Sequence, residues 1–317
     1  MNIFLAIIIC TIIFEYVLSF ISRKLNLQSL KIELPEDFVG FYDDEKYAKS
    51  QKYTRENSQF GLINSTFNFL VILAIISFGL FDTLDFYVRS FGVSPLITGI
   101  MFFGIITIIQ DIISTPFILY NTFVIEEKYG FNKSTPKIFI MDKLKSYLLL
   151  IIMGIPLISV ILFFFESLEN AWFYAWCSMS FLSVIMPKIY TQFIAPLFNK
   201  FTPLEAGELR NLIKNYSKEV DFPLTEVYVV DGSKRSAHSN AYFTGFGKNK
   251  RIVLFDTLTE NHTNKEILAI LAHEVGHYKQ KHIIKGMIAS IIHSGIMLYL
   301  LGIFIKMPEL HAAMGMN

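Results

Sequence analysis

The sequence predicts a mainly α-helical protein, namely a polytopic transmembrane helical bundle with one small α+β unit inserted on its cytoplasmic side. Hydrophobic residues make up 53% of the 317 residues and charged residues only 17%, against about 25% charged residues in soluble domains. Six apolar stretches are long enough to cross a bilayer, and only one long segment is polar. This composition excludes a disordered chain, and a net charge of +1 gives no sign of a nucleic-acid partner.

The six stretches match the length that a membrane-spanning helix needs. A hydrocarbon core about 30 Å thick requires about 20 apolar residues, and a helix satisfies its own backbone polar groups in lipid. The first stretch has no basic residue before it, and Arg23 and Lys24 come after it, so we expect a retained anchor rather than a signal peptide. The predicted spans are approximately Asn2–Ile21, Leu62–Phe81, Pro95–Tyr120, Ser146–Phe165, Trp172–Phe193 and Ile284–Ile305.

Basic residues are distributed unevenly between these spans. Arg89 is the only Lys or Arg in the second connection and the fourth has none, whereas the first, third and fifth connections hold seven, five and twelve basic residues. Positive residues favour the cytoplasmic side, which places the odd-numbered connections inside and the N-terminus outside. We therefore expect a multi-pass protein of the endoplasmic reticulum membrane or a bacterial inner membrane, with the inserted unit facing the cytoplasm.

This pattern divides the chain into three domains: a five-span bundle at 1–200, a cytoplasmic α+β insert at 201–283, and a sixth span with the start of a C-terminal part at 284–317. Capping boxes predict a helix start at Thr202–Glu205 and another at Thr263–Glu266. Alternating apolar residues predict three strands between them, the last two joined as a hairpin. These strands are Glu226–Val230, Asn240–Phe246 and Arg251–Leu258.

The second of these helices carries the pattern HEVGH at residues 273–277. Positions i and i+4 project from one helix face, so His273 and His277 can ligate one Zn²⁺ ion. Glu274 can then act as the general base that takes a proton from the attacking water and later delivers it to the leaving amine. Chance predicts only about 0.01 such patterns in this composition. The sequence thus indicates a zincin-like unit that cuts peptide bonds, in which an edge strand holds an extended substrate.

A third zinc ligand, which hydrolytic sites require, is not evident. Gln280 and Ile283 stand where an extended H-E-x-x-H-x-x-G-x-x-H motif needs Gly and His. His282 lies about 140° around a continuous helix from His277, so we expect it to be a solvated helix-end residue. Three nearby acidic residues are expected to cap helices or end a strand: Asp256, Glu260 and Glu266. We expect the third ligand to lie beyond Asn317.

With these features in place, the chain resembles the type I C-a-a-X prenyl protease family, integral-membrane zinc metalloproteases that process prenylated proteins. Four separate segments of the chain carry the match, and the one at residues 234–258 is highly specific. They are VIEEKYGFNKST at 124–135, APLFNKFTPLEAGELR at 195–210, KRSAHSNAYFTGFGKNKRIVLFDTL at 234–258 and LAHEVGHYKQKH at 271–282.

The resemblance implies a seven-span bundle around a water-filled chamber, with zinc at its cytoplasmic end. It implies that His273 and His277 are the metal ligands, that Glu274 is the catalytic base, and that the strand Asn240-Ala241-Tyr242 pairs with the substrate backbone. In this family a seventh span and a later helix come next, and that helix carries the Glu that completes the zinc site. The chain is therefore expected to correspond to roughly the first three quarters of a family member and to be inactive alone.

The function predicted is that of a membrane-embedded zinc metalloendopeptidase that cleaves near the C-terminus of prenylated proteins. Its expected partners are a prenylated or membrane-associated polypeptide and the lipid bilayer, with no nucleic acid. Three alternatives stay open: a non-catalytic scaffold or pseudoprotease, a general quality-control protease for membrane proteins, and a six-span transporter. The transporter is disfavoured because the sequence shows neither an inverted repeat nor a pair of broken half-helices.

Overall fold

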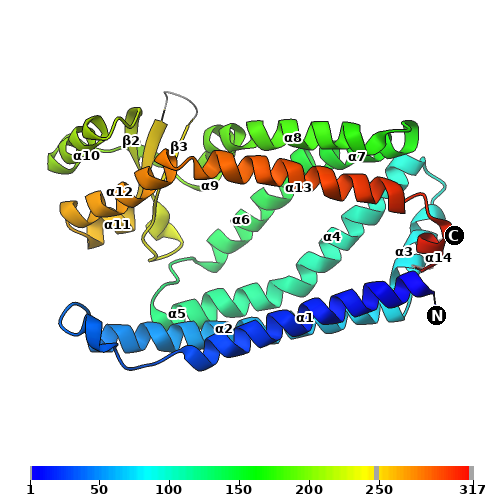
Figure 1. Cartoon of the computed structure of the whole chain (residues 1–317), viewed down its shortest axis with the longest axis horizontal. Helices are drawn as coiled ribbons and strands as arrows, with labels where there is room; N and C mark the ends of the chain where they lie inside the picture. Colours follow the sequence, from blue (N-terminus) through cyan, green and yellow to red (C-terminus); the bar gives the residue numbers. More distant parts are fainter. Residues whose placement is uncertain (1, 246–249, 314–317) are drawn as a thin grey trace. The chain divides into compact units, whose positions relative to one another are not determined.

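The computed structural model describes residues 2–245 and 250–313, and in this part of the chain six helices are long and apolar enough to cross a membrane. The predicted fold class, a helical membrane bundle with a small sheet, is confirmed (Figure 1). Internal contacts group the chain into two compact units, Met1–Gly130 with Ile303–Asn317, and Phe131–Gly302. The division into domains at residues 200 and 283 stays a prediction.

The regular elements of the first unit are all helices in its described residues. The helix α1 packs along α2, where the Tyr16 ring stacks on Phe69 with 4.0 Å between ring centroids. The Tyr16 hydroxyl also lies 2.8 Å from that of Thr66. The elements of the first unit are α1 Ile3–Ser29, η1 Glu36–Phe38, α2 Asp44–Ser77, α3 Leu80–Arg89, α4 Pro95–Tyr120, η2 Asn121–Glu126, α5 Glu127–Tyr129 and α14 Pro308–Ala313.

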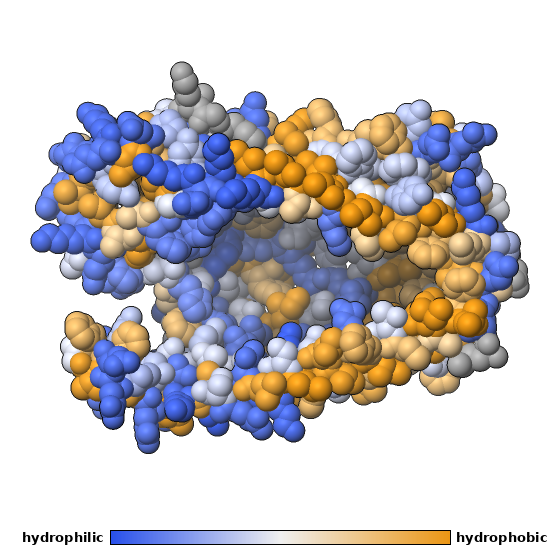
Figure 2. Space-filling model, in the orientation of Figure 1, coloured by the Kyte–Doolittle hydropathy of each residue, from blue (hydrophilic) through white to orange (hydrophobic). Residues whose placement is uncertain are grey.

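The second unit combines membrane helices with the polar insert. Figure 2 shows hydrophilic residues over the end that carries α10 to α12, and hydrophobic residues along α13. Its helical elements are α6 Pro136–Leu149, η3 Leu150–Gly154, α7 Ile155–Ser167, α8 Ala171–Ile189, η4 Tyr190–Ile194, α9 Ala195–Phe198, α10 Glu208–Glu219, η5 Gly232–Lys234, α11 Asp256–Asn261, α12 Asn264–Lys279 and α13 His282–Phe304.

Two wide π-helical turns, η3 and η4, interrupt the membrane helices of this unit. In each case a proline, Pro156 or Pro196, stands two residues after the turn. Proline lacks the N–H that would bond four residues back, and its ring clashes with that carbonyl. The wider turn relieves this clash and lets the helix continue.

A four-stranded sheet organises the insert, with strand order β1-β2-β4-β3. Its strands are β1 Phe201–Pro203, β2 Leu224–Val230, β3 Ala241–Thr244 and β4 Lys250–Phe255. β2 and β4 are parallel, while β1 pairs with β2 and β3 pairs with β4 in antiparallel fashion. Apolar residues of the strands and of α10 to α12 form the core, including the fully buried Ile213, Val227, Leu254, Ile267 and Leu271. β3 is therefore an edge strand that lies against α12.

Two local predictions for the insert are wrong. Thr202 begins no helix, because Thr202 and Pro203 pair with β2 and the Leu204 N–H donates to the Val227 carbonyl at 2.8 Å. Long-range strand pairing thus overrides the local capping pattern, and the helix begins only at Glu208. The last strand ends at Phe255, because Asp256 starts α11 and its carboxylate accepts the Thr257 N–H at 2.8 Å. The antiparallel pairing of the last two strands is confirmed, and residues 246–249 of their connection lie outside the described residues.

The second capping box is confirmed and leads to a prediction. The Thr263 hydroxyl accepts the Glu266 N–H, and the Glu266 carboxylate accepts the Thr263 N–H at 2.8 Å. We expect Thr263→Ala to destabilise the start of α12 by about 1 kcal/mol. The backbone N–H of Thr263 lowers the pKa of Glu266, so this carboxylate stabilises the fold above its unfolded pKa and loses that effect as the pH falls through the lowered value.

Thermal unfolding of the purified protein at neutral and acidic pH checks this prediction. The Thr263→Ala variant should melt a few degrees lower at neutral pH, and the difference should shrink as the pH falls through the lowered pKa of Glu266, where its carboxylate becomes protonated. Equal melting temperatures at neutral pH would show that the box does not stabilise this helix.

Candidate active site

The helix α12 presents the predicted catalytic residues on one side and the core of the insert on the other. Ile267, Leu271 and Val275 are buried and succeed one another at four-residue spacing along the face that packs against the sheet. His273 is exposed on a different face, and His277 is half-buried. The same helical period that buries the apolar stripe therefore brings the two imidazole rings together.

The two imidazoles fit a zinc ion. The Nε2 atoms of His273 and His277 lie 3.0 Å apart, and their ring centroids lie 4.7 Å apart. Two nitrogen ligands at about 2.0–2.1 Å from a tetrahedral ion lie about 3.3 Å from each other. The observed separation of the two nitrogens differs from this value by only a few tenths of an ångström.

Glu274 lies between the two histidines and is half-buried. Within the described residues, no hydrogen bond or ion pair engages its carboxylate. It is thus available to accept a proton beside the imidazole pair, as a general base must be.

The nearby acidic residues do not complete a metal site. Glu266 is engaged in the capping box, and the Asp256 carboxylate accepts hydrogen bonds from the Ser233 N–H and hydroxyl. Glu260 is exposed on α11. In residues 2–245 and 250–313, no group of three His, Cys, Asp or Glu side chains could hold a metal ion. The third ligand expected beyond Asn317 stays a prediction.

His282 is exposed at a helix end, the start of α13, as expected, but α12 does not continue through it. The helix ends at Lys279, and Lys281 adopts a positive φ of 54° before α13 begins at His282. This reversal turns the His282 ring back toward α12. Its Nδ1 atom lies 2.7 Å from the Nδ1 atom of His277. His282 is therefore an exposed helix-end residue that also contacts the predicted ligand His277.

The predicted substrate strand lies at an open sheet edge, and its register defines which backbone groups face outward. The Phe255 N–H donates to the Asn240 carbonyl at 3.0 Å, and Ala241 lies opposite Leu254. Because hydrogen-bonded pairs alternate in an antiparallel ladder, Tyr242 also bonds to β4 while the backbone groups of Ala241 and Phe243 point away from it. The Asn240 side chain accepts the Ala241 N–H at 2.8 Å, which leaves the Phe243 N–H as the open donor.

Segments far apart in the sequence hold this strand in place. The Lys133 N–H donates to the Arg235 carbonyl at 3.0 Å, and the Ala237 N–H donates to the Phe131 carbonyl at 2.9 Å. The Arg235 guanidinium binds both carboxylate oxygens of Asp142 on α6, at 2.6 and 2.9 Å. It also donates to the Asn199 side-chain oxygen at 2.8 Å. Three of the four segments that carry the family resemblance thus meet at the base of β3.

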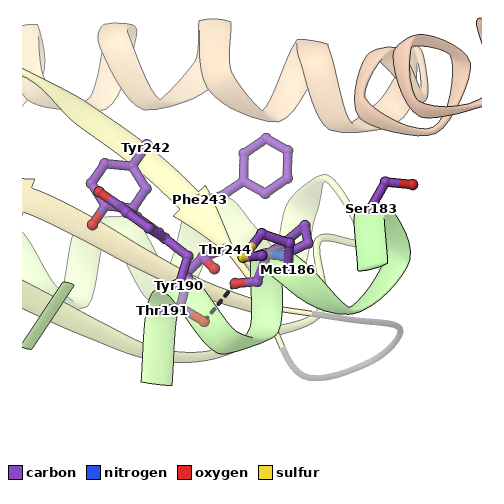
Figure 3. A pocket seen from close by; sticks show the side chains of 8 residues that line it. Ser183, Met186, Tyr190, Thr191, Tyr242, Phe243 and Thr244 are labelled. Atoms are coloured by element: carbon purple, nitrogen blue, oxygen red, sulfur yellow. Dashed lines mark hydrogen bonds between the residues drawn. The ribbon is translucent and has the colours of Figure 1, made fainter. Parts of the chain in front are cut away.

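A groove of about 560 Å³ lies between β3 and the second half of α8, and sequence reasoning missed the residues from α8 and η4 (Figure 3). Burial raises the pKa of the Tyr242 phenol to about 12, so its hydroxyl stays protonated and can donate a hydrogen bond. Pro187 and Pro196, which flank η4, are the sequence signal that could have indicated this irregular wall. The groove is lined by Ser183, Met186, Pro187, Tyr190, Thr191, Tyr242, Phe243 and Thr244.

Comparison with protein families covers almost the whole chain. Residues 23–200 match the CAAX prenyl protease N-terminal family, described as five membrane helices. Residues 203–316 match peptidase family M48. The two matches meet at residues 200–203, where β1 follows the last of these five membrane helices.

Individual relatives give the same result. The chain is 42% identical over 294 residues to the probable CAAX prenyl protease 1 of Schizosaccharomyces pombe, covering 87% of this chain and 60% of that protein. It is 34% identical over 338 residues to the CAAX prenyl protease 1 homolog of Mus musculus, covering 92% of this chain and 71% of that protein.

A solved structure is similar over nearly the full chain. The crystal structure of S. mikatae Ste24p superposes with a TM-score of 0.92 at 33% identity, covering 98% of this chain and 74% of that one. The chain thus spans between three fifths and three quarters of the length of these relatives. With its membrane helices, its sheet and its HEVGH helix, the chain belongs to peptidase family M48, a family of metallopeptidases, in the group of multi-pass CAAX prenyl proteases.

Proposed function

We propose that this protein is a membrane-embedded zinc metalloendopeptidase that cleaves near the C-terminus of prenylated C-a-a-X proteins. The observation that carries the proposal is the pair of Nε2 atoms, 3.0 Å apart, on the helix that packs against the open edge strand β3. The relatives named as CAAX prenyl proteases support the substrate class.

The substrate is proposed to bind as an added strand along β3. The outward backbone groups of Ala241 and Phe243 can pair with an extended peptide, and the Phe243 N–H is the donor open to a substrate carbonyl. Asn240 contributes by holding the Ala241 N–H, so the side chain and backbone of Asn240-Ala241-Tyr242 define where the added strand begins. Because β3 lies against α12, we propose that a peptide bound at this edge runs close to the helix that carries His273 and His277.

Peptide hydrolysis then needs three contributions from this chain. His273 and His277 hold the metal, and β3 orients the scissile carbonyl. Glu274 takes the proton of the attacking water and delivers it to the leaving amine. When bound, zinc supplies Lewis-acid polarisation and makes water more acidic, toward a pKa of about 7.

A cleavage assay with purified full-length protein in detergent tests the function. A farnesylated C-a-a-X peptide should be cut near its C-terminus, as mass spectrometry of the products reports. A metal chelator should abolish the cleavage and added zinc should restore it. Equal cleavage of the same peptide without its farnesyl group would favour the quality-control alternative, and no cleavage of either peptide would favour the scaffold.

The edge-strand part of the proposal predicts an alternating pattern. N-methylation of one substrate amide removes a donor, so it should lower kcat/KM about five- to tenfold at positions whose N–H faces β3. Methylation at the intervening positions should have little effect, because those N–H groups point away from the sheet. Unmethylated peptide provides the reference rate. Equal losses at successive positions would show that the substrate does not bind as a strand at this edge.

A further inference from the structure

The His277 imidazole has a neighbour at each of its two ring nitrogens. Its Nε2 atom faces the Nε2 atom of His273 at 3.0 Å. Its Nδ1 atom faces the Nδ1 atom of His282 at 2.7 Å, which is hydrogen-bonding distance. The rings of His277 and His282 are inclined by 65°, with 5.0 Å between their centroids. Among the described residues, no other side chain hydrogen-bonds to His277.

We propose that His282 is a positioning residue, which accepts the Nδ1–H of His277 and so presents the Nε2 lone pair of that ring to the metal. This inference rests on the proposed zinc site. A neutral imidazole carries one proton, and the partner of one nitrogen decides which tautomer is present. A histidine ligand commonly donates its second N–H to a fixed acceptor, which orients the ring and raises metal affinity. The acceptor is here the Nδ1 atom of a second imidazole.

The backbone turn between α12 and α13 brings His282 next to the Nδ1 atom of His277. Lys281 adopts a φ of 54°, a conformation that a residue with a Cβ rarely takes. Hydrogen bonds on both sides hold the turn: the Lys281 N–H donates to the Tyr278 carbonyl at 2.9 Å, and the Lys285 N–H donates to the Lys281 carbonyl at 2.9 Å. Such conformations persist where the surrounding structure imposes them, and they concentrate at functional sites. Without this turn, a continuous helix would carry His282 away from His277.

The same geometry excludes His282 as the third ligand. A metal held between the two Nε2 atoms lies on the His273 side of the His277 ring, whereas His282 lies against the opposite nitrogen. His282 can therefore act on the metal only through His277. Substitutions of His282 should therefore change zinc affinity only through the orientation and tautomer of His277, whereas substitutions of His273 or His277 remove a ligand.

Zinc affinity of the purified full-length protein tests this role without relying on activity. The protein is stripped of metal and titrated with zinc against a chelator of known affinity. His282→Ala should weaken zinc binding about 10- to 100-fold. In His282→Asn the side-chain oxygen takes the place of Nδ1 and can still accept the proton, so affinity should stay within about threefold of the unaltered protein. His293→Ala, an exposed histidine on α13, is the matched control and should bind zinc unchanged.

Each outcome separates the alternatives. Unchanged affinity in His282→Ala, with zinc bound normally by the unaltered protein, would overturn this inference and leave the zinc site standing. An equal loss in the Ala and Asn variants would overturn it as well, because it would show that accepting the Nδ1 proton of His277 is not what His282 contributes. Failure of the unaltered protein to bind zinc would overturn the metal site itself, and the positioning role with it. Melting temperatures of all variants show whether each one is folded.

Discussion

Replacing Glu274 with Gln is expected to abolish peptide cleavage while leaving zinc bound. The amide keeps the size and shape of the carboxylate, but it cannot accept a proton from water. Since proton transfer by a positioned group contributes about 10²- to 10⁴-fold, we expect kcat to fall by at least about 10²-fold. The measurement is cleavage of a farnesylated C-a-a-X peptide by the purified full-length protein, together with its zinc content.

Glu260→Gln is the matched control, because Glu260 is an exposed glutamate on α11 outside the proposed machinery. This variant should retain full activity. Turnover by Glu274→Gln within a factor of a few of the unaltered protein would remove Glu274 from the mechanism. Loss of zinc in the same variant would instead indicate that Glu274 supports the metal site.

The double variant His273→Ala, His277→Ala is expected to lose its zinc. The two Nε2 atoms lie 3.0 Å apart on one face of α12, and their removal takes away two of the three protein ligands that a hydrolytic zinc site uses. Elemental analysis of the purified protein should show about one zinc per chain before the substitutions and less than about one tenth after them. Peptide cleavage should disappear with the metal.

Each single variant and His293→Ala complete this experiment. The single variants should bind zinc more weakly than the unaltered protein, because each retains one imidazole, while His293→Ala should be unaffected. Stoichiometric zinc in a folded double variant would show that the ion binds elsewhere in the protein.

The amino-acid sequence alone determined the features that depend on local spacing. Six apolar segments predicted six candidate spans, because crossing a bilayer is a matter of length and composition. The Thr263–Glu266 box predicted the start of α12 for a similar reason, since both partners lie within one helical turn. The spacing of His273 and His277 placed their rings together, because the helical period alone brings positions i and i+4 to one face.

Only the tertiary structure decided the features that depend on distant or irregular backbone. Thr202 matches a capping pattern, yet it pairs with β2, because hydrogen bonds to a strand formed by residues 224–230 replace those of a helix start. The open edge of β3 depends on the parallel pairing of β2 with β4, which no local period encodes. The place of His282 depends on one positive φ at Lys281, a non-glycine residue whose sequence gives no warning of that conformation. Local periodicity depends only on nearby residues in the sequence. Strand order and the positive φ of Lys281 depend on how the whole unit packs.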